Sequence, residues 1–276
     1  MANTQTLTRP LLLAGCGKMG GAMLAGWRKS GITAAGVIVV EPMAAPDFAN
    51  NDDVEIVASP DDIPASVNPE VVVFAVKPQQ MDSVAPAYAR FVKPETVFLS
   101  IAAGKTIGYF ENHLGSGAAI VRAMPNTPAA IGQGITVTCP NANVSTDQNG
   151  LCEALMKSVG DAVSVEDENL IDAVTALSGG GPAYVFLLIE CLTEAGVQSG
   201  LPRDLAAKLS LATVAGSGQL ALTSDEAPAI LRKNVTSPGG TTLEALNVLM
   251  AEDGLQPLLT KAIAAATARS QELAAG

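Results

Sequence analysis

Glycines at three places in the chain are spaced so that backbone N–H groups can bind an anion. The first group reads Gly15-Cys16-Gly17-Lys18-Met19-Gly20, and it follows a short apolar stretch and opens a helical one. The G-x-G-x-x-G spacing allows a tight turn, a close approach of the backbone to a pyrophosphate, and packing of helix on strand. The helix N-terminus adds free N–H groups. We therefore predict a dinucleotide site at Gly15, Gly17, Lys18, Met19 and Gly20; the alternative is a glycine-rich turn without a ligand.

Glu41 ends the second predicted strand, about 20 residues after the glycines, where an acidic side chain binds the ribose hydroxyls of NAD. A 2′-phosphate in the same place would be repelled by roughly 4 kcal/mol at about 4 Å and an effective dielectric constant of about 20, less where solvent and salt screen it. No arginine follows among residues 42–47 to offset this. We expect NADH to be used at least as well as NADPH. The alternative is a solvated carboxylate beside Pro42.

Three further segments follow predicted strands, at the sheet edge where open α/β folds bind ligands. They read Val73-Phe74-Ala75-Val76-Lys77-Pro78-Gln79, Ser100-Ile101-Ala102-Ala103-Gly104 and Arg122-Ala123-Met124-Pro125-Asn126-Thr127-Pro128. Any one of them alone would be a plain turn, but together they suit a nicotinamide cleft. The cofactor residues expected here are Ala75, Val76, Lys77, Pro78, Ala102 and Asn126.

The two remaining glycine clusters lie in the second half of the chain. They read Ser178-Gly179-Gly180-Gly181-Pro182-Ala183-Tyr184 and Val235-Thr236-Ser237-Pro238-Gly239-Gly240-Thr241-Thr242, and each leads into a predicted helix. Without side chains, N–H groups can converge on an anion at a helix N-terminus. Thr242 would stand in the first helical turn, with its hydroxyl beside the same pocket. For each cluster the alternative is a loop that joins two helices.

The elements that must position these residues change in kind near residue 165. Short apolar strands, expected at residues 11–14, 37–41, 71–76, 97–101, 120–123, 135–139 and 162–165, alternate with helices at 21–30, 79–89, 107–114 and 146–159. This pattern predicts an α/β, Rossmann-type dinucleotide-binding domain with a doubly wound parallel sheet over residues 1–165. Only helices follow, at 169–177, 182–199, 202–222, 242–250 and 255–273, which predicts an all-α domain over residues 166–276. Residues 184–189 are apolar all round, so their helix should be buried between subunits.

The composition of this 276-residue chain argues against some classes of partner. Its net charge of −11 argues against nucleic acid, and no uninterrupted apolar run reaches the length of a membrane span. Cys16, Cys139, Cys152 and Cys191 form no CxxC pair, and with His113 alone they predict buried free thiols in a reducing cytoplasm and no metal site. Residues 12–16 resemble a lipoprotein cleavage box, but Pro10 leaves too short an apolar stretch before it. The apolar content of 48% predicts a large subunit interface.

Taken together, these motifs resemble the pyrroline-5-carboxylate reductase family, in the family's order and over nearly the whole chain; the element Ser237–Thr242 is the most diagnostic. The resemblance implies reduction of 1-pyrroline-5-carboxylate to L-proline by NAD(P)H, the last step of proline biosynthesis, and a helical dimerisation domain that interlocks with a second subunit. It implies that residues 75–78 line the nicotinamide end of the cofactor. It also implies that Ser237, Gly239, Gly240, Thr241 and Thr242 hold the substrate carboxylate, with Thr242 near the imine nitrogen. Asp225 stands where the family has a glutamate, and no role is assigned to it.

The expected chemistry needs few side chains. A protonated imine supplies its own electron sink, so positioning of hydride donor and acceptor dominates, and Thr242 would orient the ring nitrogen as the catalytic residue. A β-hydroxyacid dehydrogenase would instead need a basic lysine, and none of Lys208, Lys233 and Lys261 follows a glycine cluster as expected. A dinucleotide sensor without catalysis would not need the second anion site.

Overall fold

The structure is a computed structural model that describes residues 6–43, 48 and 52–275. It divides into two compact units: unit 1 runs to Gly179 and includes the end of the last helix from Ala266, and unit 2 is Gly180–Ala265. The strand pattern ends with residue 164, next to the expected boundary at 165/166. The two compact units, however, divide after Gly179, so the domain boundary at 165/166 stays a prediction.

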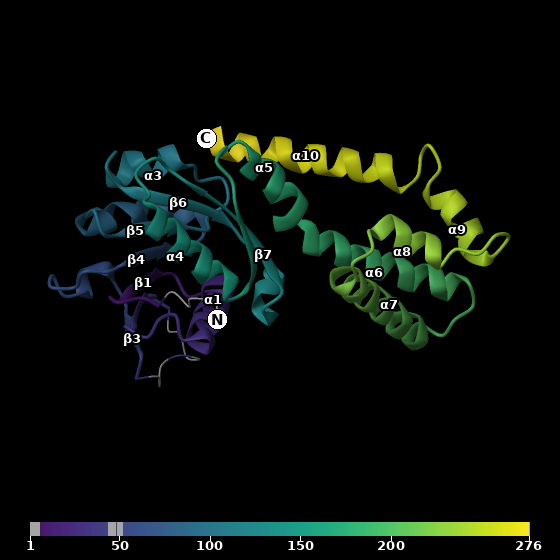
Figure 1. The fold of residues 1–276 in the computed structure, drawn as a ribbon, viewed down its shortest axis with the longest axis horizontal. Helices are drawn as coiled ribbons and strands as arrows, with labels where there is room; N and C mark the ends of the chain where they lie inside the picture. Colours follow the sequence, from purple (N-terminus) through teal and green to yellow (C-terminus); the bar gives the residue numbers. More distant parts are fainter. Residues whose placement is uncertain (1–5, 44–47, 49–51, 276) are drawn as a thin grey trace. The chain divides into compact units, whose positions relative to one another are not determined.

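Unit 1 is built on one eight-stranded sheet (Figure 1). Its spatial order is β3-β2-β1-β4-β5-β6-β7-β8. The strands are β1 (Leu11–Ala14), β2 (Val37–Val40), β3 (Val54–Val57), β4 (Val71–Phe74), β5 (Val97–Ser100), β6 (Ala119–Met124), β7 (Gly134–Pro140) and β8 (Gly160–Ser164). From β1 the next strands in the chain lie on one side, as β2 and β3, and from β4 they lie on the other side. This reversal of strand order between β1 and β4 defines the doubly wound arrangement. The expected α/β fold class is confirmed.

Helices cover both faces of the sheet, and alternate strand residues serve the two cores. On one face, Leu11 and Leu13 of β1 pack with α1 (Lys18–Ser30) and α4 (Thr146–Lys157). On the other, Leu12 and Ala14 pack with α2 (Met81–Val84) and α3 (Ile107–Leu114). The strands are therefore apolar on both sides, which explains their continuous Val, Ile and Leu runs.

One strand pair departs from the parallel sheet that was expected. β6 and β7 are antiparallel, whereas the other strand pairs of the described sheet are parallel. A parallel crossover requires about a dozen residues or more and usually a helix. The connection from Met124 to Gly134 is shorter and holds only the 3₁₀ turn η5 (Thr127–Ile131), so the chain turns back.

Three elements were missed or misplaced. The helix expected at residues 79–89 is broken into η3 (Pro78–Gln80), α2 and η4 (Ala85–Phe91), because Pro86 lacks an N–H and cannot continue an α-helix. The strand β3 was missed, since Glu55 interrupts its apolar pattern. The short helix α8 (Pro228–Asn234) in unit 2 was also missed.

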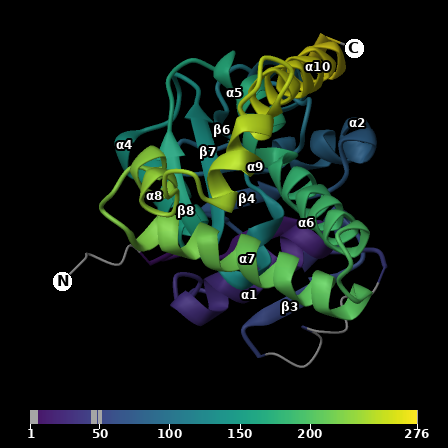
Figure 2. The ribbon, with the colours of Figure 1, turned by 90° about the vertical axis from the view of Figure 1, so that its right-hand side faces the viewer.

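Unit 2 consists of helices. It holds α6 (Gly181–Gln198), α7 (Arg203–Thr223), α8, α9 (Thr241–Leu249) and the first part of α10 (Leu255–Ala275). Figures 1 and 2 show α6 and α7 side by side. Residues 170–174 form α5 (Leu170–Val174) in unit 1.

The helix expected to be buried, α6, has no buried residue in the single chain. Phe186 is 58% exposed, and Val185, Leu187 and Leu188 are exposed beside it. Leu170–Gln198 and Arg203–Thr223 are also long and apolar enough to cross a membrane, by length and composition alone. The apolar side chains of α6 and α7 are thus largely exposed in the single chain.

None of the four cysteines forms a disulfide, but only two of them fit the expectation of burial. Cys139 and Cys152 are buried, and burial raises the pKa of each thiol. Cys16 is half-buried in the glycine loop, and Cys191 is exposed because it lies on α6. Burial is therefore wrong for Cys16 and Cys191 in the single chain.

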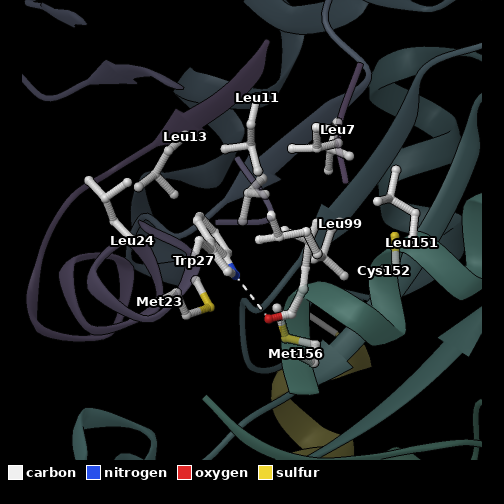
Figure 3. Packing of buried hydrophobic residues seen from close by; sticks show 14 of the residues in the cluster. Leu7, Leu11, Leu13, Met23, Leu24, Trp27, Leu99, Leu151, Cys152 and Met156 are labelled. Carbon is white, nitrogen blue, oxygen red and sulfur yellow. Dashed lines mark hydrogen bonds between the residues drawn. The ribbon is translucent and has the colours of Figure 1, made fainter. Parts of the chain in front are cut away.

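Trp27 connects α1 to α4 in the larger core (Figure 3). Its indole is fully buried, and Nε1–H donates to the Leu155 carbonyl at 2.9 Å. The neighbouring side chains are apolar, among them Met23, Leu24 and Met156.

We expect Trp27→Phe to lower the free energy of unfolding of unit 1 by about 1–3 kcal/mol, because it removes one of the two hydrogen bonds to the Leu155 carbonyl, the other being donated by the Ser158 hydroxyl at 2.7 Å, and replaces a fully buried indole by a smaller ring. Denaturant unfolding followed by circular dichroism measures this. Lys29→Gln, on the exposed side of the same helix, is the control and should change stability by less than about 0.5 kcal/mol. Equal unfolding midpoints for Trp27→Phe and wild type would contradict the role of this hydrogen bond.

Candidate functional site

The three glycines of the first loop have three different local environments. Gly15 has φ +90°, and a Cβ there would lie 2.9 Å from the Ala75 carbonyl oxygen. A Cβ on Gly20 would collide with the Gly15 carbonyl oxygen and lie 3.3 Å from the Ala75 Cβ. Nothing lies within 4 Å of the Cβ position of Gly17. The first glycine therefore makes the turn, the third packs α1 on the sheet, and the second leaves the backbone open to a ligand.

A cavity of about 510 Å³ opens beside this loop. We call it the glycine-loop cavity. Six of the expected cofactor residues line it, namely Gly15, Gly17, Glu41, Ala75, Val76 and Lys77. The other lining residues are Ala14, Cys16, Val40, Pro42, Met43, Ala58, Pro60, Gln80, Ser83, Val84 and Tyr88. These residues come from the ends of β1, β2, β3 and β4 and the segments that follow them. The cavity thus lies at the carboxyl edge of the sheet, beside the point where strand order reverses.

Glu41 points back toward the glycine loop. Its Oε2 accepts the Cys16 N–H at 2.8 Å and its Oε1 accepts the Met43 N–H at 3.1 Å. A carboxylate has about four acceptor positions, so two remain for hydroxyl donors. The carboxylate is thus held by two backbone N–H groups, and its contact with a ribose stays a prediction. Residues 44–47, on which the absence of an arginine partly rests, lie outside the described residues.

The other expected cofactor residues do not line this cavity. Lys18 and Met19 begin α1, and Gly20 packs behind the loop. Pro78 begins η3. Ala102 is buried. Asn126 holds other segments instead: its Oδ1 accepts the Ile135 N–H at 2.9 Å and its amide donates to Ser178 Oγ at 3.4 Å.

Arg122 is a charged residue inside the sheet whose role the sequence analysis missed. It is 2% exposed, and its Nη1 donates to Glu168 Oε1 at 2.7 Å. The same carboxylate oxygen accepts the Ile107 N–H at 2.8 Å. The pair therefore ties β6 to the start of α3 and to the segment before α5. An arginine in an otherwise apolar strand was the signal that could have revealed it.

The cluster at residues 178–181 is helical, where a loop was expected. Thr175–Gly179 form a π-helical turn, η6, which continues α5, and α6 begins at Gly181. A Cβ on Gly179 would lie 3.4 Å from the Met124 Sδ at the end of β6. Single π-helical turns occur often at functional sites. Here the turn brings Ser178 and Gly179 beside Met124 and Asn126 in unit 1.

The cluster at residues 237–242 belongs to unit 2 and has the predicted form. Gly239 has φ +68°, the Gly240 N–H donates to the Ser237 carbonyl at 3.1 Å, and α9 begins at Thr241. Thr242 is therefore in the first helical turn, as expected. The first N–H groups of a helix have no intrahelical acceptor, so Thr241 and Thr242 present donors at the positive end of α9.

Two cationic side chains and one carboxylate lie close to this loop in the chain. Arg232 and Lys233, at the end of α8, line a cavity of about 470 Å³ together with Thr236 and residues of α9. Glu226, next to Asp225, accepts the Asn234 amide N–H at 3.1 Å. No role is assigned to Asp225. Glu226 is the acidic residue whose hydrogen bond to Asn234 holds the segment before the loop.

The glycine loop fits a dinucleotide in its chemistry. Gly17 leaves backbone exposed at the N-terminus of α1, and the acceptor oxygens of Glu41 lie beside it. A Cβ at Gly15 would close the turn on which this cradle depends. The residues present can bind a pyrophosphate and an adjoining ribose.

Comparison with known proteins agrees with both halves of the chain. A family model described as "Pyrroline-5-carboxylate reductase dimerisation" matches residues 168–273, and one described as "NADP oxidoreductase coenzyme F420-dependent" matches residues 11–104. Pyrroline-5-carboxylate reductase of Pseudomonas aeruginosa is 41% identical over 97% of each chain. That of Synechocystis is 42% identical over 86% of this chain and 87% of the relative.

Solved structures show the same likeness. A pyrroline-5-carboxylate reductase from Coxiella burnetii has a TM-score of 0.88 and 35% identity, over 97% of this chain and 99% of that one. A Plasmodium falciparum pyrroline carboxylate reductase with NADP bound has a TM-score of 0.82 and 31% identity, over 98% and 99%. The chain belongs to the pyrroline-5-carboxylate reductase family.

Proposed function

We propose that the protein reduces 1-pyrroline-5-carboxylate to L-proline with NADH or NADPH, in the cytoplasm, as the last step of proline biosynthesis. The observation that carries this proposal is that one member of that family has both the glycine-loop cavity and, in Ser237–Thr242, a glycine turn that leads into the start of α9. Residues 1–165 bind the cofactor in this proposal, and residues 166–276 bind the substrate and form the dimer.

The N-terminal half holds the cofactor through few groups. N–H groups at the start of α1 bind the pyrophosphate, Glu41 accepts from the ribose hydroxyls, and residues 75–78 line the path toward the nicotinamide. When bound, the reduced nicotinamide supplies a hydride. The strand-end residues Ala102 and Asn126 complete that edge of the sheet.

The C-terminal half holds the substrate. The N–H groups of Gly239 to Thr242 bind its carboxylate, and the positive end of the α9 dipole stabilises that charge. The Thr242 hydroxyl orients the ring nitrogen, whose proton makes the imine carbon electrophilic. No strong side-chain acid is required, because the protonated nitrogen accepts the electron pair of the C=N bond as the hydride arrives.

The direct test is loss of reduced-nicotinamide absorbance with 1-pyrroline-5-carboxylate, with a 3-hydroxy acid and oxidised cofactor assayed in parallel. Proline should accumulate in proportion to the cofactor consumed. No turnover of the imine by the folded protein would refute the proposed function, and turnover of the hydroxy acid would favour a β-hydroxyacid dehydrogenase.

We expect Thr242→Ala to lower kcat/KM for the imine about 10- to 100-fold, which corresponds to roughly 1.4–3 kcal/mol of transition-state stabilisation. Its KM for the cofactor should barely change. Thr146→Ala is the matched control, since Thr146 also stands in a first helical turn, at the start of α4 in unit 1. Wild-type turnover in Thr242→Ala would remove the hydroxyl from the mechanism.

We expect the wild-type protein to use NADH at least as well as NADPH, because the Glu41 carboxylate faces the glycine loop. Glu41→Ser should lower KM for NADPH more than KM for NADH, by relieving the repulsion of a 2′-phosphate. Initial rates with both cofactors on the same imine measure this, with the exposed Glu55→Ser on β3 as control. A tenfold preference of the wild type for NADPH would show that Glu41 does not face the ribose.

A second copy of the chain is the proposed cover for the apolar surface of α6 and α7. The family model that spans residues 168–273 is described as a dimerisation region, and it contains both helices. Their exposed side chains include Phe186, Leu187, Leu211 and Leu220. Burying such surface is worth about 25 cal/mol per Å², which favours a subunit interface over solvent exposure.

We expect an oligomer whose subunit interface exceeds ~2,000 Å². Light scattering at micromolar protein concentration should therefore give at least twice the mass of one chain. Phe186→Asp should shift the protein toward monomer, because it places a charge in the apolar interface. Ile131→Asp is the control, since Ile131 is 78% exposed but lies in unit 1. A wild-type chain that is monomeric, folded and active would refute the oligomer.

A further inference from the structure

Tyr88, one of the residues that line the glycine-loop cavity, carries a buried hydroxyl that has no partner among the residues that the structure describes. Tyr88, in η4, is 0% exposed and contributes to the cavity lining. None of the described residues makes a hydrogen bond with its Oη. By contrast, Tyr109 in the same unit donates its hydroxyl to Asp82 at 2.6 Å. Most buried polar side-chain atoms find a partner, so an exception requires a reason.

The ring of Tyr88 is held firmly by its neighbours. It packs edge-on against Phe74, with ring centroids 5.3 Å apart and planes at 82°, and it contacts Phe91 at 6.2 Å. Burial raises the pKa of Tyr88, so the group stays a neutral phenol that can both donate and accept. Its hydroxyl therefore has a defined position and versatile chemistry.

The glycine-loop cavity has apolar lining residues besides its polar ones. They include Ala58 and Pro60 after β3 and Val84 before η4, and they suit a flat heterocycle next to the ribose that Glu41 is proposed to bind. The Ser83 hydroxyl is already engaged, because it donates to the Gln80 carbonyl at 2.8 Å. Tyr88 is thus a polar side chain of this region with hydrogen-bonding capacity left over.

We propose that the Tyr88 hydroxyl forms a hydrogen bond with the purine ring of the bound dinucleotide, and that Tyr88 is a determinant of base recognition. The inference rests on the proposed dinucleotide binding at the glycine-loop cavity. A purine edge carries ring-nitrogen acceptors and an amino donor, and a phenol can pair with either. Ligand binding then satisfies a group that has no hydrogen-bond partner among the described residues.

The proposed hydrogen bond predicts that removing the Tyr88 hydroxyl weakens dinucleotide binding but does not lower the stability of the free protein. Tyr88→Phe keeps the ring and its packing but removes the hydroxyl. In the full-length protein, its Kd for NADH should rise about three- to tenfold, the range of one neutral hydrogen bond. Its Kd for reduced nicotinamide mononucleotide, which lacks the purine, should not change. The melting temperature of the free protein should stay equal or rise, because a buried unsatisfied group is gone.

Tyr109→Phe is the matched control, since it removes a hydroxyl that has a protein partner. It should leave both Kd values unchanged. Equal affinity of Tyr88→Phe and wild type for NADH would overturn the proposal and indicate that water satisfies the hydroxyl. An equal loss for NADH and for the mononucleotide would also overturn it, since that indicates general distortion. A wild type that binds neither ligand would instead overturn the proposed function.

Discussion

The close approach of backbone segments at the end of β1 is the constraint on which the nucleotide-binding half depends. Gly15 lies against Ala75 and Val76, and Gly20 lies against Gly15, with no room for a side chain at either glycine. This contact sets where α1 begins and how closely it lies on the sheet. The burial of Trp27 against α4 follows from that placement. A larger residue in the loop would therefore disturb the cavity and the core together.

The helical half has a different physical problem, since its apolar surface exceeds what its own helices cover. No residue of α6 is buried, and large apolar side chains are exposed along α7 as well. Covering this surface is the role proposed for a second copy of the chain. Substrate binding at the start of α9 is thus proposed in the same unit as the subunit interface.

Cofactor choice shows why local geometry matters beyond family membership. The Plasmodium falciparum relative was solved with NADP bound. In this chain, the Glu41 carboxylate accepts two backbone N–H groups, one of them from the glycine loop. In the proposed cofactor site, a carboxylate held in this way would not easily swing aside for a 2′-phosphate. The proposed preference for NADH therefore depends on one side chain and its two hydrogen bonds rather than on the fold as a whole.

The sequence by itself determined the glycine turn, the strand–helix alternation, the helical second half and the start of α9 near Thr242. These features depend on backbone freedom and apolar periodicity, which are local properties of the chain. Tertiary structure alone decided the reversal of β7, the pairing of the buried Arg122 with Glu168, and the burial of a Tyr88 hydroxyl that finds no partner among the described residues. Each of these joins segments far apart in the chain or depends on what surrounds a side chain. No local pattern encodes such packing, because the contact energies arise only once the sheet and its helices have assembled.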